Sequence, residues 1–245
     1  MLREKPDKIN LYRLFFIGLL FTISLSALAQ NNFRHELSLG VNGGTTISTV
    51  NFKTSKFAIR ESRLIQSAGG LSVRFISEKN IGILGEINYS QRGWGESKLD
   101  DPDFHYSRQL NYLEVPVMTH IYFDAGKHFR VVFNLGPQVG YYLYGKDLKR
   151  NFTYPPNDDA DEHLYNNPNT RPYINQKIER PFDWGLCFGG GVEFRTSMGN
   201  FVLDGRYYFG LSDIFNNSKA DYFASSSNQV IGVKLTYLFD LRAKN

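Results

Sequence analysis

Hydrophobic and polar residues alternate one by one along most of this chain. In residues 110–123, LNYLEVPVMTHIYF, every second position from Leu113 is apolar or threonine, whereas the positions between include Glu114 and His120. Such alternation is typical of a β-strand with a different environment on each face. The pattern recurs in eight segments of roughly ten residues or more, without a helical period after residue 29: 33–46, 64–77, 80–93, 108–124, 127–143, 182–196, 199–212 and 229–241.

The connections between these segments alternate in length. Short connections around 77–80, 124–127 and 196–200 resemble tight hairpin turns. Long connections hold most of the Asn, Asp, Ser, Lys and Pro, and they span 47–63, 94–107, 144–181 and 213–228. An even number of strands with both ends on the short-turn side is the plan of an outer-membrane barrel. We therefore predict an all-β fold, an eight-stranded antiparallel up-and-down transmembrane β-barrel.

The less apolar face of the segments carries a balanced set of charges. An eight-stranded barrel is only wide enough for side chains to fill its interior, and buried charges persist when they are paired. We therefore predict a polar network inside the lumen, formed by four cationic and four anionic residues: Arg74, Glu86, Glu114, Arg130, Glu193, Asp204, Arg206 and Lys234.

Aromatic residues mark both ends of the apolar face. Near the short turns these are Phe33, Phe75, Phe123, Phe129, Phe194, Phe201 and Phe239, and about eight to ten residues away lie Tyr89, Tyr141, Trp184 and Phe209. Two such girdles are expected of a surface that faces lipid, so we expect outer-membrane lipid as a partner. The alternative is a secreted lipocalin-like barrel, in which the apolar face points inward around a ligand.

The N-terminus has the features of a signal peptide. Basic residues precede an apolar run from Leu14 to Leu28, and Ala27 and Ala29 fit a small-x-small cleavage site. We expect residues 1–29 to be a cleaved signal peptide and residues 30–245 to be the outer-membrane barrel domain. Residues 1–29 hold four Lys/Arg and two Asp/Glu, so their removal lowers the net charge from +4 to about +2. This near balance argues against a nucleic-acid partner.

Six motifs resemble the PorT-like outer-membrane β-barrel family that is common in the Bacteroidetes. They are INYSQRGW (87–94), LNYLEVPV (110–117), LGPQVGYYL (135–143), DWGLCFGGGVEF (183–194), LDGRYYFGLSDI (203–214) and VIGVKLTYLF (230–239). The resemblance implies the location and the barrel architecture, and it raises a role in a protein-secretion machinery. Pro116 is unusual in a paired strand, but it is a regular feature within the resemblance. We expect a bulge or a local break in the strand ladder there.

Residues for catalysis or cofactor binding are scarce. Glu114 and His120 share the inward face of one strand, but no serine is identifiably matched to the histidine. The other histidines have no spacing typical of a metal site, and Cys187 is the only cysteine, which excludes an intramolecular disulfide. We therefore expect no enzymatic activity, no metal and no cofactor.

The longest connection, 144–181, is our first candidate for a recognition surface. It combines prolines with aromatic residues, among them Phe152, Tyr154, Tyr165 and Tyr173, and it is expected to bind other envelope proteins. The favoured function is a structural or interaction role, as a candidate component of an envelope or secretion assembly. The alternatives are a small pore or uptake channel, a barrel hydrolase acting on lipid or peptide, and the lipocalin-like barrel.

Overall fold

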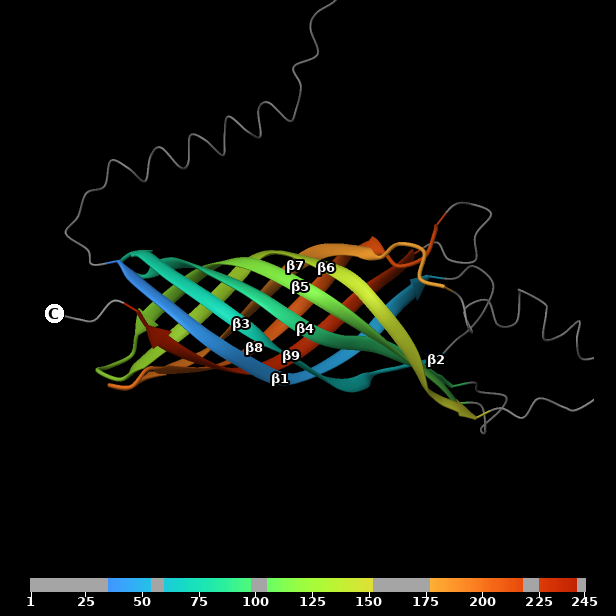
Figure 1. The fold of residues 1–245 in the computed structure, drawn as a ribbon, viewed down its shortest axis with the longest axis horizontal. Coiled ribbons are helices and arrows are strands. Elements are labelled where there is room, and N and C mark those ends of the chain that lie inside the picture. Colours follow the sequence, from blue (N-terminus) through green and yellow to red (C-terminus); the bar gives the residue numbers. More distant parts are fainter. Residues whose placement is uncertain (1–34, 54–59, 98–104, 152–176, 218–224, 242–245) are drawn as a thin grey trace, which may run out of the picture. The chain divides into compact units, whose positions relative to one another are not determined.

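A computed structural model describes residues 35–53, 60–97, 105–151, 177–217 and 225–241 (Figure 1). Among these residues, no helix is long and apolar enough to cross a membrane. Two predictions lie outside the described residues: the signal peptide at 1–29, and the aromatic side chains Phe152, Tyr154, Tyr165 and Tyr173. The strands are β1 (Glu36–Lys53), β2 (Arg60–Ser62), β3 (Leu64–Glu78), β4 (Ile81–Ser97), β5 (His105–Asp124), β6 (Phe129–Asn151), β7 (Phe182–Arg195), β8 (Asn200–Asp213) and β9 (Ser225–Asp240).

Eight of these strands form a closed antiparallel ring. The order around the ring is β4-β3-β1-β9-β8-β7-β6-β5, and β4 also pairs with β5, which closes the sheet. The first and last strands pair with each other, with Val41 opposite Tyr237. The short strand β2 lies outside the ring order and pairs with residues 95–97 of β4. This arrangement confirms the predicted eight-stranded up-and-down barrel.

Three tight turns lie at one end of the barrel, together with the start of β1 and the end of β9 (Figure 1). The turn between β3 and β4 places Asn80 in the left-handed region, with φ of 72°, a conformation that asparagine tolerates better than most residues. The Asn80 amide donates a hydrogen bond to the carbonyl of Tyr122 (2.7 Å). This bond ties the turn to the neighbouring strand β5.

At the opposite end, several strands are longer than predicted. β4 continues to Ser97, β5 begins at His105 and β6 continues to Asn151, so our prediction that the connections begin at 94 and 144 and that the first of them ends at 107 was wrong. The pairing of β6 with β5 shifts register at Leu143 and again at Leu148. Each shift adds one residue to β6 and changes which face the following side chains occupy. Strict alternation therefore ends before the strand does.

The apolar face of the ring points outward. Leu71, Ile83, Leu135 and Val233 are each more than half exposed, and the side chains between the apolar positions are buried. The lipocalin-like alternative requires the opposite orientation, with the apolar residues inside, and is therefore wrong.

Pro116 interrupts the ladder without adding a residue. Strand β5 pairs with β4 at Glu114 and again at Val117 in the same register, but no pairing exists at the two residues between them. Proline has no N–H to donate to the neighbouring strand. This missing donor accounts for the local break, and β5 keeps the same register on both sides of it. Of the two expected outcomes, the structure has the break and not the bulge.

Replacing Leu235 with arginine is expected to lower the free energy of unfolding by about 2–4 kcal/mol, the range for a lipid-facing cation near the bilayer midplane. Leu235 is exposed on β9, four residues from the aromatic Phe239. Urea unfolding in lipid vesicles measures the effect, and Leu235→Ala separates the loss of the leucine from the cost of the charge. Equal values for the two variants would contradict a lipid-facing position.

Candidate functional site: the filled lumen

Three groups of ion pairs lie inside the barrel. The lower group is nearest the short turns. Arg74 pairs with Glu193 (2.8 Å), and both side chains are fully buried. Arg130 pairs with Asp124 (2.8 Å) and Glu36 (3.6 Å), which are partly exposed at the rim. The lower group thus closes the short-turn end of the lumen with charges held by five different strands.

The middle group is centred on Glu86 of β4. One oxygen of this carboxylate accepts hydrogen bonds from Arg206 (2.8 Å), Lys234 (2.6 Å) and Asn88 (2.9 Å). Arg206 also pairs with Asp204 on its own strand. Two cations therefore face two anions, and these contacts join β4 to β8 and β9 across the lumen.

The upper group is centred on Arg92, which is 1% exposed. Its guanidinium pairs with Glu114 (2.7 Å) and Asp183 (2.6 Å). It also lies over the rings of Tyr112 (5.0 Å) and Tyr208 (4.4 Å), a cation–π arrangement. Further hydrogen bonds to the two carboxylates come from Gln138, Ser212 and Asn228. One arginine therefore links β4, β5 and β7 across the barrel.

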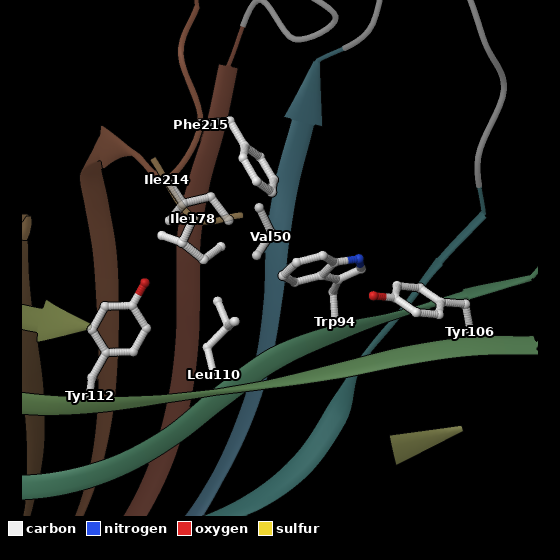
Figure 2. Packing of buried hydrophobic residues seen from close by; sticks show 8 residues of the cluster. All are labelled: Val50, Trp94, Tyr106, Leu110, Tyr112, Ile178, Ile214 and Phe215. Carbon is white, nitrogen blue, oxygen red and sulfur yellow. The ribbon is translucent and has the colours of Figure 1, made fainter. Parts of the chain in front are cut away.

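Apolar side chains meet at the end of the barrel that carries the long connections (Figure 2). We call this set the mouth cluster: Val50, Trp94, Tyr106, Leu110, Tyr112, Ile178, Ile214 and Phe215. Five members come from the strands β1, β4 and β5, and three come from the segments 177–181 and 214–217 that follow or precede strands. These two segments cover the mouth, and their apolar side chains point toward Leu110 and Trp94.

A small cavity of about 50 Å³ lies between the middle and upper groups. Its lining includes Arg92, Glu114, Arg206 and Lys234, together with the thiol-bearing Cys187. A cavity of this size has room for only a few water molecules. Among the described residues, charged groups and apolar side chains thus occupy most of the lumen, and this cavity leaves a little space for solvent.

Residues 28–216 match the family model described as outer membrane protein beta-barrel domain. The chain belongs to this family. Its apolar outer face therefore lies in the lipid of an outer membrane. Curated proteins give no match to the chain.

Solved structures with similar folds include Ail of Yersinia pestis, with 16% identity, coverage of 83% of this chain and 99% of Ail, and a TM-score of 0.38. OprG of Pseudomonas aeruginosa has 11% identity, coverage of 84% and 93%, and a TM-score of 0.44. Outer Membrane Protein W of E. coli has 14% identity, coverage of 85% and 100%, and a TM-score of 0.41. These identities are too low to transfer a function.

In this family member, the structure places all eight sequence-predicted charges on the inner face and distributes them over the three groups. The lower group contains Arg74, Arg130 and Glu193, the middle group contains Glu86, Asp204, Arg206 and Lys234, and the upper group contains Glu114. Sequence reasoning missed Arg92 and Asp183. Both lie on the inward parity of their strands, Arg92 with Glu86 and Asp183 with Glu193, so the alternation itself contained the missing signal.

The pair considered for hydrolysis is not brought together. The Nδ1 atom of His120 lies 2.8 Å from the amide oxygen of Asn134, and its ring stacks on Tyr122. Glu114 belongs to the upper group with Arg92. In the described part of the chain, no serine or cysteine is hydrogen-bonded to His120, and no three His, Cys, Asp or Glu side chains are grouped to hold a metal ion.

Proposed function

We propose that this protein is a closed, non-enzymatic outer-membrane barrel with a structural or interaction role. The observation that supports it is the filling of the lumen by three ion-pair groups and the mouth cluster. A pore of ordinary size would need these groups to separate, and separating buried charges from their partners costs several kcal/mol each. The barrel therefore serves as a rigid anchor, and the segments at its mouth are the parts available to partners.

A finer role in an envelope or secretion assembly is supported by the PorT-like motifs, of which LNYLEVPV (110–117) is the most distinctive. Three of its residues belong to these sets: Leu110 and Tyr112 to the mouth cluster and Glu114 to the upper group. The motif thus serves the closure of the barrel. We assign partner binding to the connection around 152–176, because it contains aromatic and proline residues.

We expect the purified protein to give no steady ion conductance in planar lipid bilayers. The matched positive control is the triple variant Glu86→Gly, Arg206→Gly and Lys234→Gly, which removes the side chains of the middle group and should raise the frequency of channel openings. Steady openings by the unmodified protein, at a rate similar to that of the triple variant, would favour a pore.

Partner binding is tested with a photo-crosslinking residue at Tyr144, which is exposed at the mouth end of β6. We expect envelope proteins to be captured at Tyr144 and not at Leu71, an exposed residue on the lipid-facing surface. Capture that persists after deletion of 152–176 would exclude that connection as the binding surface.

For the hydrolase alternative, loss of lipid or peptide processing in His120→Ala, with the barrel intact on a gel, would contradict a non-enzymatic role.

A further inference from the structure

Strands β6 and β7 separate before β6 ends. Their ladder runs from Phe129 opposite Phe194 to Tyr141 opposite Phe182. One more bond joins them, from the N–H of Tyr142 to the carbonyl of Pro181 (2.7 Å). Beyond this point the described residues of β6 pair with β5 alone, as far as Asn151. Within the described part of the chain, one edge of β6 therefore presents backbone donors and acceptors that no other described strand uses.

The chain that would continue β7 along this edge turns over the mouth. We call residues 177–181 the strap. The N–H groups of Glu179 and Arg180 both donate to the carbonyl of Ile214 (3.3 and 3.2 Å). Ile178 is buried in the mouth cluster, where Figure 2 shows it beside Ile214. The strap thus covers part of the lumen entrance.

Exposed polar contacts hold the rest of the strap. The guanidinium of Arg180 donates to the side-chain oxygens of Asn216 (3.3 Å) and Asn217 (3.4 Å). The N–H of Asn216 donates to the carboxylate of Glu179 (2.7 Å). Solvent competes for such bonds, and a segment with one buried apolar side chain belongs to the least stable parts of a fold.

The free edge of β6 offers the strap a second position with matching faces. Leu143 is the extra residue in the register of β6. With Tyr142 opposite Pro181, continued pairing places Tyr144 opposite Arg180 and Lys146 opposite Ile178. Arg180 and Ile178 have the outward parity of the lipid-side residue Phe182, and Tyr144 and Lys146 are exposed on the same side of β6.

Pro181 provides the hinge. It lacks an N–H, so it cannot return a hydrogen bond to the carbonyl of Tyr142. The ladder is therefore weakest at the residue where the strap departs from the sheet.

We propose that the strap is a lid with two positions. In the position described here it inserts Ile178 into the mouth cluster. In the other position it extends β7 along β6 and turns Ile178 outward. The change uncovers Leu110 and Trp94 and gives solvent access to the upper group around Arg92. It needs no rearrangement of the ring, and the lower and middle groups stay closed.

The first test is thiol labelling in a Cys187→Ala background with a membrane-impermeant maleimide. Ile178→Cys should react more slowly than the exposed Tyr144→Cys but clearly faster than Met118→Cys, which lies 1% exposed in the lumen. Adding Glu179→Gln and Arg180→Ala should raise the rate at Ile178→Cys about fivefold, the factor expected for the loss of roughly one net hydrogen bond. A heat-dependent gel shift checks that each variant remains a closed barrel.

The second test is a disulfide between Lys146→Cys and Ile178→Cys in the same background. Asp147→Cys with Ile178→Cys is the matched control, because Asp147 accepts a hydrogen bond from Tyr106 on the other face of β6. We expect only the first pair to crosslink. Protection of Ile178→Cys equal to that of Met118→Cys, together with no disulfide to position 146, would show a fixed mouth and overturn the proposal.

A third measurement keeps Ile178 in place, since its replacement could itself loosen the lid. In Trp184→Phe, Trp94 is the remaining tryptophan of the chain. Quenching of its fluorescence by iodide should increase when Glu179→Gln and Arg180→Ala are added. Unchanged quenching would contradict a lid that these two side chains hold.

Discussion

Arg92→Met is expected to lower the free energy of unfolding by about 3–5 kcal/mol, the usual cost of removing one partner from a buried ion pair. Glu114 and Asp183 would each lose the guanidinium that lies within 2.7 Å of their oxygens. Both carboxylates are buried, so solvent cannot replace the lost charge. The rings of Tyr112 and Tyr208 would lose their cation as well.

Urea unfolding of the refolded protein in lipid vesicles measures this loss. Arg195→Met is the matched control, because it removes the same charge from a half-exposed position next to a short turn. The triple variant Arg92→Met, Glu114→Gln and Asp183→Asn should recover most of the stability, since it removes the uncompensated charges. If Arg92→Met and Arg195→Met lower the free energy of unfolding by the same small amount, the ion pairs of the upper group do not stabilise the barrel.

Glu86→Gln is expected to cost a similar amount, about 3–5 kcal/mol, because it leaves buried cations without their counter-charge. One oxygen of Glu86 accepts bonds from both Arg206 and Lys234. After the substitution, Asp204 would be the one anion left in the middle group beside two cations. The shape of the side chain is kept, so the loss reports the charge.

The same unfolding assay applies, with Glu78→Gln as control. Glu78 is exposed at the end of β3, and substitutions at such sites usually change stability by less than about 0.5 kcal/mol. The double variant Glu86→Gln and Lys234→Met restores the charge balance and should be more stable than Glu86→Gln alone. A lower stability of the double variant would show that packing, and not charge, dominates at this site.

The ring could be predicted from the sequence because lipid and lumen impose opposite demands on neighbouring residues. Leu71 and Val73 face lipid, whereas Ser72 and Arg74, each the next residue along the strand, are buried. This demand holds only where the strand crosses the membrane. Beyond it, the environment of β6 no longer differs so sharply between its faces, and the shifts at Leu143 and Leu148 break the period. Strand ends were therefore placed too early.

The site was predicted in composition but not in arrangement. The alternation of apolar and polar residues identified eight charged residues on the inner face. Which of these residues form ion pairs depends on the register between strands, and alternation does not reveal that register. The mouth cluster was missed for a different reason. Trp94 and Tyr106 are apolar residues that point inward, as Leu84 and Met118 also do lower in the barrel, and a rule that assigns apolar residues to the lipid face does not predict them. The strap was missed because nothing in the sequence indicates which residue of the connection 144–181 packs into the mouth, where Ile178 is buried.

The pairing of β1 with β9 has a consequence for how the barrel is made. Ser38 lies opposite Asp240 and Lys53 opposite Ser225, so the seam joins the two ends of the domain. Until the last strand arrives, β3 is the one neighbour that β1 has. A chain that stops before Ser225 keeps two unpaired edges, and neither can be satisfied in lipid. A chain that lacks β9 therefore cannot close the ring, so assembly depends on the arrival of the last strand.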